Sequence, residues 1–145
     1  MSILLDTNVL SEVRRLAADP KVLAWLDGVD EDRTFISVAS IAELKRGIGL
    51  MDEGRKRTAL AAWLAWDLPA RFAGRILPIN PVVAECWGDL MAQARISGFA
   101  LSVMDGFFAA TALASGFVLA TRNTKNFAPL GVPVFNPWTD ASVPE

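Results

Sequence analysis

Asp6, Glu43 and Asp105 are lone acids, each at the edge of an otherwise apolar segment. Burying an unpaired carboxylate costs several kcal/mol, so acids placed in this way usually have a partner. If the fold brings the three together, their mutual repulsion favours the binding of a cation. Mg²⁺ or Mn²⁺ fits best, because hard cations take oxygen ligands and keep several waters. Such an ion can lower the pKa of a bound water and offset charge on a phosphodiester.

Each of these acids also has a simpler interpretation. Asp6 and Asp105 stand where helices are predicted to begin, and aspartate is a favoured N-cap that the helix dipole stabilises. Glu43, taken alone, is typical of a solvated helix surface. The metal-site interpretation therefore depends on all three acids lying at one edge of a sheet.

Short apolar runs alternate with helical patterns along the chain. The predicted strands are Ser2–Leu5, Thr34–Ser37 and Phe117–Thr121, with weaker, proline-flanked candidates at Arg75–Ile79 and Val132–Phe135 that suit sheet edges. The predicted helices are Asn8–Leu16, Pro20–Gly28, Ala39–Leu50, Asp52–Asp67, Pro81–Ser97 and Asp105–Ser115. This alternation predicts a three-layer α/β/α fold with a central, mainly parallel sheet of four to five strands, in a single domain over residues 1–145.

The predicted elements place the three acids near one another. Asp6 ends the first strand, and Glu43 is expected on the first turn of the helix after the second strand. Asp105 is expected to open the apolar helix that leads into the strand at 117–121. In α/β sheets ligands bind at the carboxyl edge of the strands, so we expect the site there.

Composition narrows the chemistry further. The 145 residues include no histidine and one cysteine, Cys86, which excludes Ser-His-Asp and Cys-His triads, histidine-ligated zinc and a disulfide within the chain. Hydrophobic residues make up 52% of the chain, which is high and indicates that both faces of a sheet, or a partner surface, are covered. We therefore expect an oligomer or an obligate partner.

Basic residues lie close in sequence to the candidate site segments. The net charge of −2 argues against a protein that coats nucleic acid by charge alone. Candidates for contact with substrate phosphates are Arg14, Arg15, Lys45, Arg46, Arg122 and Lys125. The alternative is that these are solvated charges on helix faces and loops.

One stretch resembles a membrane span in its hydropathy. Between Ile96 and Thr121 the only charged residue is Asp105. Its glycines, its central acid and its β-rich end instead favour a buried helix that runs into a core strand. The opening apolar run covers only Ile3–Leu5, so no signal peptide is visible and a cytoplasmic protein is expected.

Four collinear segments resemble the PIN-domain family, and within it the VapC or FitB type of toxin ribonucleases from prokaryotic type II toxin–antitoxin pairs. The segments are Leu4–Glu12, Ile41–Gly47, Asp105–Ala112 and Ala120–Asn123, and further marks of the FitB-like branch are Phe72–Pro78 and Phe135–Trp138. The resemblance implies a Mg²⁺- or Mn²⁺-dependent endoribonuclease of the prokaryotic cytoplasm, with RNA as substrate and a cognate antitoxin as inhibitor. It also implies a homodimer and a larger toxin–antitoxin complex that binds operator DNA through the antitoxin. No association with a membrane is expected.

The resemblance also implies roles for individual residues. Asp6 and Asp105 match the principal metal ligands, and Glu43 matches a third acid that binds metal or positions water. Residues that would fix these carboxylates through hydrogen bonds are Thr7 or Asn8, and Thr121.

The chain departs from the family pattern after the Thr-Arg pair. Many relatives carry an aspartate where this chain has Asn123, and Asn126 is likewise an amide where relatives often have aspartate. An amide oxygen can still bind metal or water but brings no charge. Three carboxylates favour one metal ion over two, and a second ion would need substrate phosphates.

Two other functions stay open at this point. A binding module that kept the fold and lost catalysis is compatible with Asn123. A phosphotransfer domain that uses Asp6 as nucleophile is less compatible, because a dehalogenase-type phosphatase would need a second aspartate where Asn8 stands.

An apolar stripe on the helix predicted over 52–67 also has two interpretations. It consists of Leu60, Trp63, Leu64 and Trp66. One interpretation is core packing, and the other is an antitoxin groove or a dimer face, because such anchors serve helix-in-groove recognition.

Overall fold

Five parallel strands form the central sheet of the computed structural model, which describes residues 1–143. Their bounds are Ile3–Leu5 (β1), Thr34–Ser37 (β2), Ile76–Leu77 (β3), Val118–Ala120 (β4) and Val134–Phe135 (β5). The order is β3-β2-β1-β4-β5, and every neighbouring pair is parallel. The two proline-flanked strands lie at the edges, as predicted. Pro144 and Glu145, which the predicted single domain includes, lie outside the described residues.

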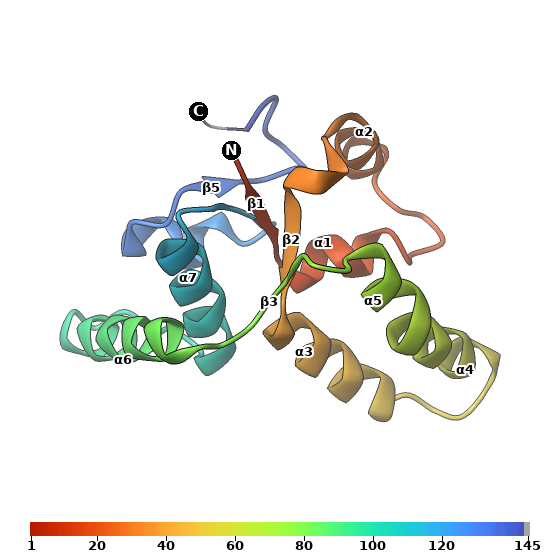
Figure 1. Ribbon diagram of the computed structural model, residues 1–145, viewed down its shortest axis with the longest axis horizontal. Helices are drawn as coiled ribbons and strands as arrows, with labels where there is room; N and C mark the ends of the chain where they lie inside the picture. Colours follow the sequence, from red (N-terminus) through yellow and green to blue (C-terminus); the bar gives the residue numbers. More distant parts are fainter. Residues whose placement is uncertain (144–145) are drawn as a thin grey trace.

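Helices cover both faces of this sheet (Figure 1). Their bounds are Thr7–Glu12 (α1), Pro20–Gly28 (α2), Val38–Gly49 (α3), Arg55–Ala62 (α4), Leu68–Arg71 (α5), Pro81–Ile96 (α6) and Val103–Ser115 (α7). Short 3₁₀ turns lie at Glu31–Arg33 (η1), Thr124–Asn126 (η3) and Ala128–Leu130 (η4), and a π-helical turn lies at Trp63–Asp67 (η2). Helices α6 and α7 lie on one side of the sheet, and α1, α2, α4 and α5 lie on the other. The predicted three-layer α/β/α fold is confirmed.

The central strand β1 shows why both faces of the sheet are buried. Ile3 and Leu5 belong to the core shared with α1, α2 and α5, whereas Leu4 belongs to the core shared with α7. All three side chains are at most 2% exposed. Because neighbouring side chains of a strand point to opposite faces, an unbroken apolar run is what a doubly covered strand requires.

The helix predicted over residues 52–67 has different bounds. It begins at Arg55, after Gly54, whose φ of 153° favours glycine. It then continues through the π-helical turn of η2 into α5. The wider turn pairs the amide of Leu68 with the carbonyl of Trp63, directly before Pro69, which has no amide hydrogen. The π-helical turn thus lets the helical chain continue through Pro69, beyond its predicted end at Asp67.

Two helices near the site also differ from the prediction. Helix α1 ends at Glu12 instead of Leu16, because the Glu12 carboxylate accepts hydrogen bonds from the guanidinium of Arg15 and the amide of Asp19. These bonds turn the chain back on itself. Glu43 lies in the second turn of α3 and not the first, because that helix begins five residues before it.

The N-cap interpretation holds for one aspartate and is wrong for the other. Asp6 is the N-cap of α1, where its carboxylate accepts a hydrogen bond from the amide of Thr7. Helix α7, in contrast, begins at Val103 with Ser102 as its N-cap. The Ser102 hydroxyl accepts from the amide of Asp105 at 3.2 Å, so Ser102, and not the carboxylate of Asp105, caps this helix.

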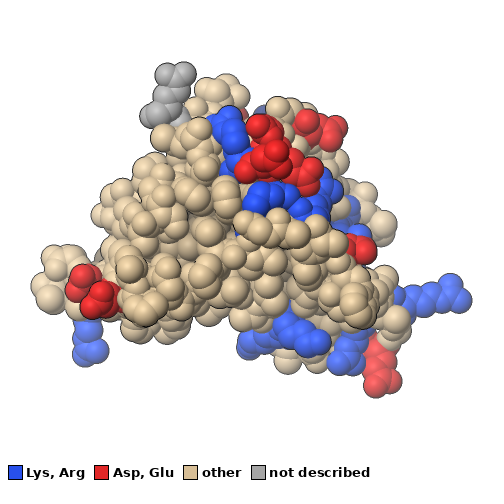
Figure 2. Space-filling model, viewed as in Figure 1, with Lys and Arg blue, Asp and Glu red and all other residues tan. Residues whose placement is uncertain are grey.

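Charged side chains are unevenly spread over the surface (Figure 2). On the face shown, acids and bases gather at the top and along the lower edge, with a broad uncharged area between them. This face therefore offers no continuous basic surface. Within residues 1–143 no helix is long and apolar enough to cross a membrane, and the apolar stretch between residues 96 and 121 forms α7 and β4.

Candidate active site

Asp6 and Thr121 lie side by side because β1 and β4 are neighbours whose carboxyl ends meet. The amide of Asp6 donates to the carbonyl of Ala120 at 2.9 Å. Asp6 is 5% exposed, and its carboxylate accepts from the hydroxyl of Thr121 and the amide of Thr7, both at 2.7 Å. Two adjacent strands thus fix this buried carboxylate at the edge of the sheet.

The side chain of Asn8 connects this pair to the loop after β4. Its amide nitrogen lies 3.4 Å from both the Asp6 carboxylate and the Thr121 hydroxyl. Its oxygen accepts from the backbone amide of Arg122 at 3.4 Å, and the Thr121 hydroxyl accepts from the amide of Asn123 at 3.0 Å. The loop that carries Asn123 is therefore held directly against the carboxylate.

Thr7 joins the second acid to the first. Its hydroxyl donates to Oε1 of Glu43 at 2.7 Å and lies 2.9 Å from the hydroxyl of Ser40. Since the hydroxyl proton of Thr7 is used by Glu43, Ser40 is the donor in the second bond. Thr7 thus binds Asp6 through its backbone and Glu43 through its side chain.

Asp105 reaches the site from the first turn of α7. It is half-buried, and the side-chain amide of Asn126 lies 3.4 Å from its carboxylate. The next residue, Gly106, is buried where a Cβ would lie 2.7 Å from the sulfur of Met91 and 2.9 Å from Nε1 of Trp87. Only glycine allows α6 to pack this closely against α7, and that packing fixes the start of the helix that carries Asp105.

The electrostatics of the site favour uptake of positive charge. Burial raises the pKa of Asp6 to about 6, against the lowering effect of its hydrogen bonds from Thr121 and Thr7. The charges of Asp105 and Glu43 raise it further. Burial also raises the pKa of Asp105. Acids that repel one another in this way bind protons unless a cation replaces them.

The side chains of these acids line one cavity of about 420 Å³. Its walls include the four residues predicted as catalytic, which are Asp6, Glu43, Asp105 and Asn123. Among residues 1–143, no three Asp, Glu, His or Cys side chains are already arranged as a group that could hold a metal ion. The fold therefore brings the acids to one cavity without closing them around a common point.

Glu12 is a fourth acid in the walls of this cavity, and the sequence pattern did not reveal its place there. It is 2% exposed, and its two oxygens lie 2.8 and 3.3 Å from Nη1 of Arg15. Burial acts to raise the pKa of Glu12, but the Arg15 guanidinium and the Asp19 amide outweigh it and lower that pKa. The signal in the sequence was an acid within an apolar helix, three residues before an arginine.

The predicted phosphate contacts divide into two groups. Arg15 and Arg122 line the cavity, and the guanidinium of Arg122 lies 5.2 Å from the ring centroid of Trp138, which is buried in the same wall. Arg14 is exposed and lines the two neighbouring hollows instead. Lys45, Arg46 and Lys125 are exposed and lie outside the described lining of the cavity.

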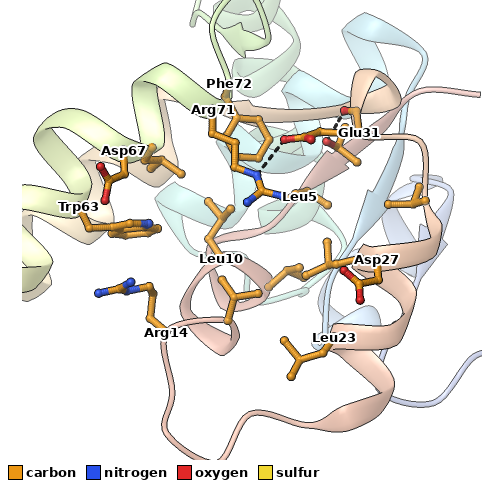
Figure 3. Close-up of a pocket in the computed structure, with 16 residues that line it drawn as sticks. Leu5, Leu10, Arg14, Leu23, Asp27, Glu31, Trp63, Asp67, Arg71 and Phe72 are labelled. Carbon is orange, nitrogen blue, oxygen red and sulfur yellow. Dashed lines mark hydrogen bonds and ion pairs between the residues drawn. The ribbon is translucent and has the colours of Figure 1, made fainter.

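Two further hollows border the same region. One, of about 750 Å³, lies among α1, α2 and α5, with Leu5, Leu10 and Phe72 in its wall and the charged Arg14 and Arg71 at its rim (Figure 3). The other, of about 810 Å³, lies among α1, α3 and α4. This second hollow adjoins the active-site cavity, because both are lined by Thr7, Ser11, Arg15 and Glu43.

The predicted apolar stripe does not form one surface. Trp63 lines both hollows and Leu60 lines the second. Leu64 is buried in the core, whereas Trp66 is 75% exposed and belongs to neither hollow. The π-helical turn explains the division, because it rotates later side chains away from the three-and-four spacing.

The fold and the site together define an α/β protein of the doubly covered parallel type, with an acidic site at the carboxyl edge of its sheet. The chain belongs to the PIN-domain family, whose profile matches residues 3–131. The resemblance of the sequence motifs to this family, and the predicted PIN-like fold, are confirmed.

Relatives and a solved structure agree with this assignment. VapC ribonuclease Y4jK from Sinorhizobium fredii is 40% identical over 139 residues, which cover 96% of this chain and 99% of that protein. Toxin FitB from Neisseria gonorrhoeae is 39% identical over 138 residues, which cover 95% and 99%. In the solved structure of FitAB bound to an IR36 DNA fragment, one chain is 36% identical with a TM-score of 0.89, over 97% of this chain and 98% of that one.

Proposed function

We propose that this protein is a Mg²⁺- or Mn²⁺-dependent endoribonuclease and the toxin of a type II toxin–antitoxin module. Relatives that match over nearly their full lengths are named as a VapC ribonuclease and as toxin FitB, which supports this activity. The observation that carries the proposal is the placement of Asp6. It is nearly buried, every described donor to its carboxylate is neutral, and it shares a cavity with Glu43 and Asp105. A carboxylate in this setting takes up a proton or is stabilised by a cation from outside the chain.

The donor set fits a hard divalent cation. Asp6, Asp105 and Glu43 would hold it, and the amide oxygen of Asn123 is a neutral further donor in the same cavity. A bound Mg²⁺ or Mn²⁺ would supply an activated water and offset the negative charge of the phosphodiester. Three carboxylates favour a single resident ion.

The chain's own residues do the positioning. The hydroxyl of Thr121 and the amide of Thr7 hold Asp6 in one orientation. Thr7 also holds one oxygen of Glu43, so the other oxygen of Glu43 is the one we assign to binding the ion or orienting water. Hydrogen bonds of this kind fix the direction of each carboxylate and tune its affinity for metal.

A cleavage assay tests the proposal directly. Purified protein is incubated with a mixed RNA pool in Mg²⁺, in EDTA, and as the Asp6→Ala and Asp105→Ala variants, with Asp89→Ala on the exposed face of α6 as the matched control. We expect cleavage by the wild type and the control in Mg²⁺, and none in EDTA or with either site variant. Cleavage that survives EDTA or both site variants contradicts the mechanism.

The same assay separates the proposal from its main alternative. Asn123 in place of a fourth carboxylate favours a PIN-fold module that binds RNA without cutting it. Binding of the RNA pool without cleavage in any divalent metal would support that module.

The inhibitor in this proposal is a cognate antitoxin, which docks in the two hollows beside α1. The hollow of about 810 Å³ shares Thr7 and Glu43 with the active site, so an occupant there also restricts access to the carboxylates. Trp63 lines both hollows. We expect Trp63→Ala to weaken antitoxin binding at least about thirtyfold, as loss of a central aromatic anchor does. The control is Trp66→Ala, because Trp66 is exposed and lines neither hollow.

The proposed assembly is a homodimer within a larger toxin–antitoxin complex of the prokaryotic cytoplasm. Exposed apolar side chains on α6 and α7, namely Val82, Ile96 and Val103, support a covered surface there. A chain similar to this one forms part of a FitAB structure bound to DNA, which supports operator binding through the antitoxin. Light scattering of the free protein and of the complex tests the assembly.

A further inference from the structure

Arg15 is held at the active-site cavity by a buried acid. Its guanidinium lies 2.8 Å from Oε1 of Glu12, whose side chain is 3% exposed, whereas the Arg15 side chain is 59% exposed. The amide of Asp19 donates to the other oxygen of Glu12 at 3.2 Å. The carboxylate is therefore fixed inside the protein, and the arginine that it binds faces solvent.

Arg122 is held at the same cavity by different contacts. Its guanidinium lies 5.2 Å from the ring centroid of Trp138, an arrangement in which the ring attracts the cation. Its backbone amide donates to Asn8, and its carbonyl accepts from the side-chain amide of Asn136, both at 3.4 Å. The charge of Arg122 also acts on Glu12, which places Glu12 within the electrostatic reach of both arginines.

These contacts create two positive groups in a cavity that is otherwise acidic. Arg15 and Arg122 line it together with Asp6, Glu43 and Asp105. A polyanion could not approach the acids unless nearby cations offset the repulsion. Because the net charge of the chain is −2, positive charge that attracts a polyanion to these acids must come from side chains close to them.

We propose that Arg15 and Arg122 form a two-point phosphate clamp that binds the RNA backbone beside the scissile phosphate, with Glu12 as the positioning residue of Arg15. This inference rests on the proposed ribonuclease function. Guanidinium groups suit the task, because their planar forks match phosphate oxygens and they stay charged. Glu12 fixes one edge of the Arg15 fork and leaves its exposed remainder for the phosphate.

The test measures RNA binding as a function of salt. A fluorescently labelled, single-stranded RNA of mixed sequence is titrated with protein in EDTA, which prevents cleavage, and the affinity is followed by anisotropy. Each phosphate contact on a single strand contributes about 0.7 to the slope of log affinity against log salt. We expect Arg15→Ala and Arg122→Ala each to lower the slope by about 0.7 and to weaken binding about fivefold at about 0.1 M salt.

The matched control is Arg71→Ala, which removes the same charge from another ion pair. Arg71 contacts Glu31 at 2.8 Å, is 69% exposed, and lies outside the described lining of the active-site cavity. We expect its salt slope to equal that of the wild type. Equal slopes for Arg15→Ala, Arg122→Ala and Arg71→Ala would overturn the clamp.

Glu12→Gln tests the positioning role. It keeps the shape of the side chain but removes its charge, so we expect KM for RNA cleavage to rise while kcat is retained. Arg15→Lys should rescue only part of the binding lost in Arg15→Ala, because an ammonium lacks the fork. If Glu12→Gln instead abolishes Mn²⁺ binding in calorimetry, Glu12 is a metal ligand and the inference is wrong.

The result also separates failure of the clamp from failure of the proposed function. If the wild type cleaves RNA in Mg²⁺ and the salt slopes of the arginine variants equal that of the wild type, the clamp is wrong and the proposed function stands. A wild type that neither binds nor cleaves RNA sinks both. Arg122→Ala removes an exposed side chain, whereas Arg15→Ala leaves the buried Glu12 carboxylate unpaired. The Arg15→Ala/Glu12→Gln double variant is therefore measured beside Arg15→Ala, and thermal unfolding checks that each variant folds.

Discussion

Two buried acids stand at the two ends of the six-residue helix α1, and they differ in their partners. Asp6 begins the helix and is 5% exposed, and Glu12 ends it and is 2% exposed. Asp6 receives hydrogen bonds from neutral groups, and its pKa is raised to about 6. Glu12 receives a guanidinium from Arg15, and its pKa is lowered.

The comparison separates an acid that the fold pairs with a cation from an acid that the fold leaves without one. Both carboxylates line the same cavity, so burial alone does not distinguish them. The difference lies in whether the chain supplies a cation. The carboxylate of Glu12 forms an ion pair with Arg15 inside the fold. The carboxylate of Asp6 has only neutral donors among the described contacts, and we therefore assign it to metal binding.

The strongest test of this difference is Asp6→Asn. A carboxyl group with a raised folded pKa stabilises the protein below its unfolded pKa of about 4 and loses that contribution as pH rises through about 6. Raising the pKa from its usual value to about 6 costs the charged form about 3 kcal/mol, so we expect the free energy of unfolding of the variant to exceed that of the wild type by up to about 3 kcal/mol at pH 7.5. The gain should vanish near pH 4. Urea unfolding at both pH values, without metal, measures it.

An Asp6→Asn protein that is less stable than wild type at pH 7.5 would remove the basis of the comparison. It would mean that the Asp6 carboxylate is already satisfied inside the fold.

Thr121→Val tests the importance of the neutral donors to Asp6. The substitution removes the hydroxyl that holds Asp6 at 2.7 Å, so we expect metal affinity and cleavage to fall about 10–100-fold. Thr111→Val is the control, because its buried hydroxyl donates only to a carbonyl of its own helix in the described contacts. Equal activity of the two variants would show that orientation of Asp6 is unimportant.

Glu12→Gln should change stability in the opposite direction from Asp6→Asn. A carboxyl group with a lowered folded pKa stabilises the protein above its unfolded pKa and loses that contribution as pH falls. We therefore expect a loss of stability at pH 7.5 that shrinks below pH 4.5, and that is smaller than the gain in Asp6→Asn because Arg15 is exposed. Urea unfolding against pH compares the two curves, and parallel curves would break the comparison.

Asn123→Asp gives the smallest expected effect. It adds a further carboxylate to the walls of the cavity. We expect Mn²⁺ to bind more tightly, by less than about tenfold, or a second ion to bind. Calorimetric titration gives both affinity and stoichiometry, and weaker binding than wild type would place Asn123 outside the metal's reach.

The sequence predicted the acids because their positions depend on local rules. An apolar run of strand length followed by an acid, as at Asp6, places that acid at the carboxyl edge wherever strands are parallel. The five-stranded sheet and the partners Thr7, Asn8 and Thr121 follow from the same logic together with the family resemblance. The roles of these residues in catalysis stay predictions.

The sequence did not predict features that depend on contacts across short, irregular segments. The three-and-four spacing of apolar residues extended the predicted first helix to Leu16. Such spacing takes no account of the hydrogen bonds that Glu12 accepts from Arg15 and Asp19, which end α1 earlier. The same spacing grouped Trp63 with Trp66, since it assumes regular turns and cannot register a π-helical one. Both errors concern side chains whose direction depends on a break in helix geometry.

Strand β1 precedes the other four strands along the chain, yet it occupies the centre of the sheet, and one of its two neighbours is β4. Asp6 therefore meets Thr121 across 115 residues of chain. A nascent chain that ends before β4 lacks the hydroxyl that orients this carboxylate and the loop that carries Arg122. The Asp6 carboxylate therefore stays without this partner until β4 joins the sheet, so the active-site cavity cannot form before that strand is in place.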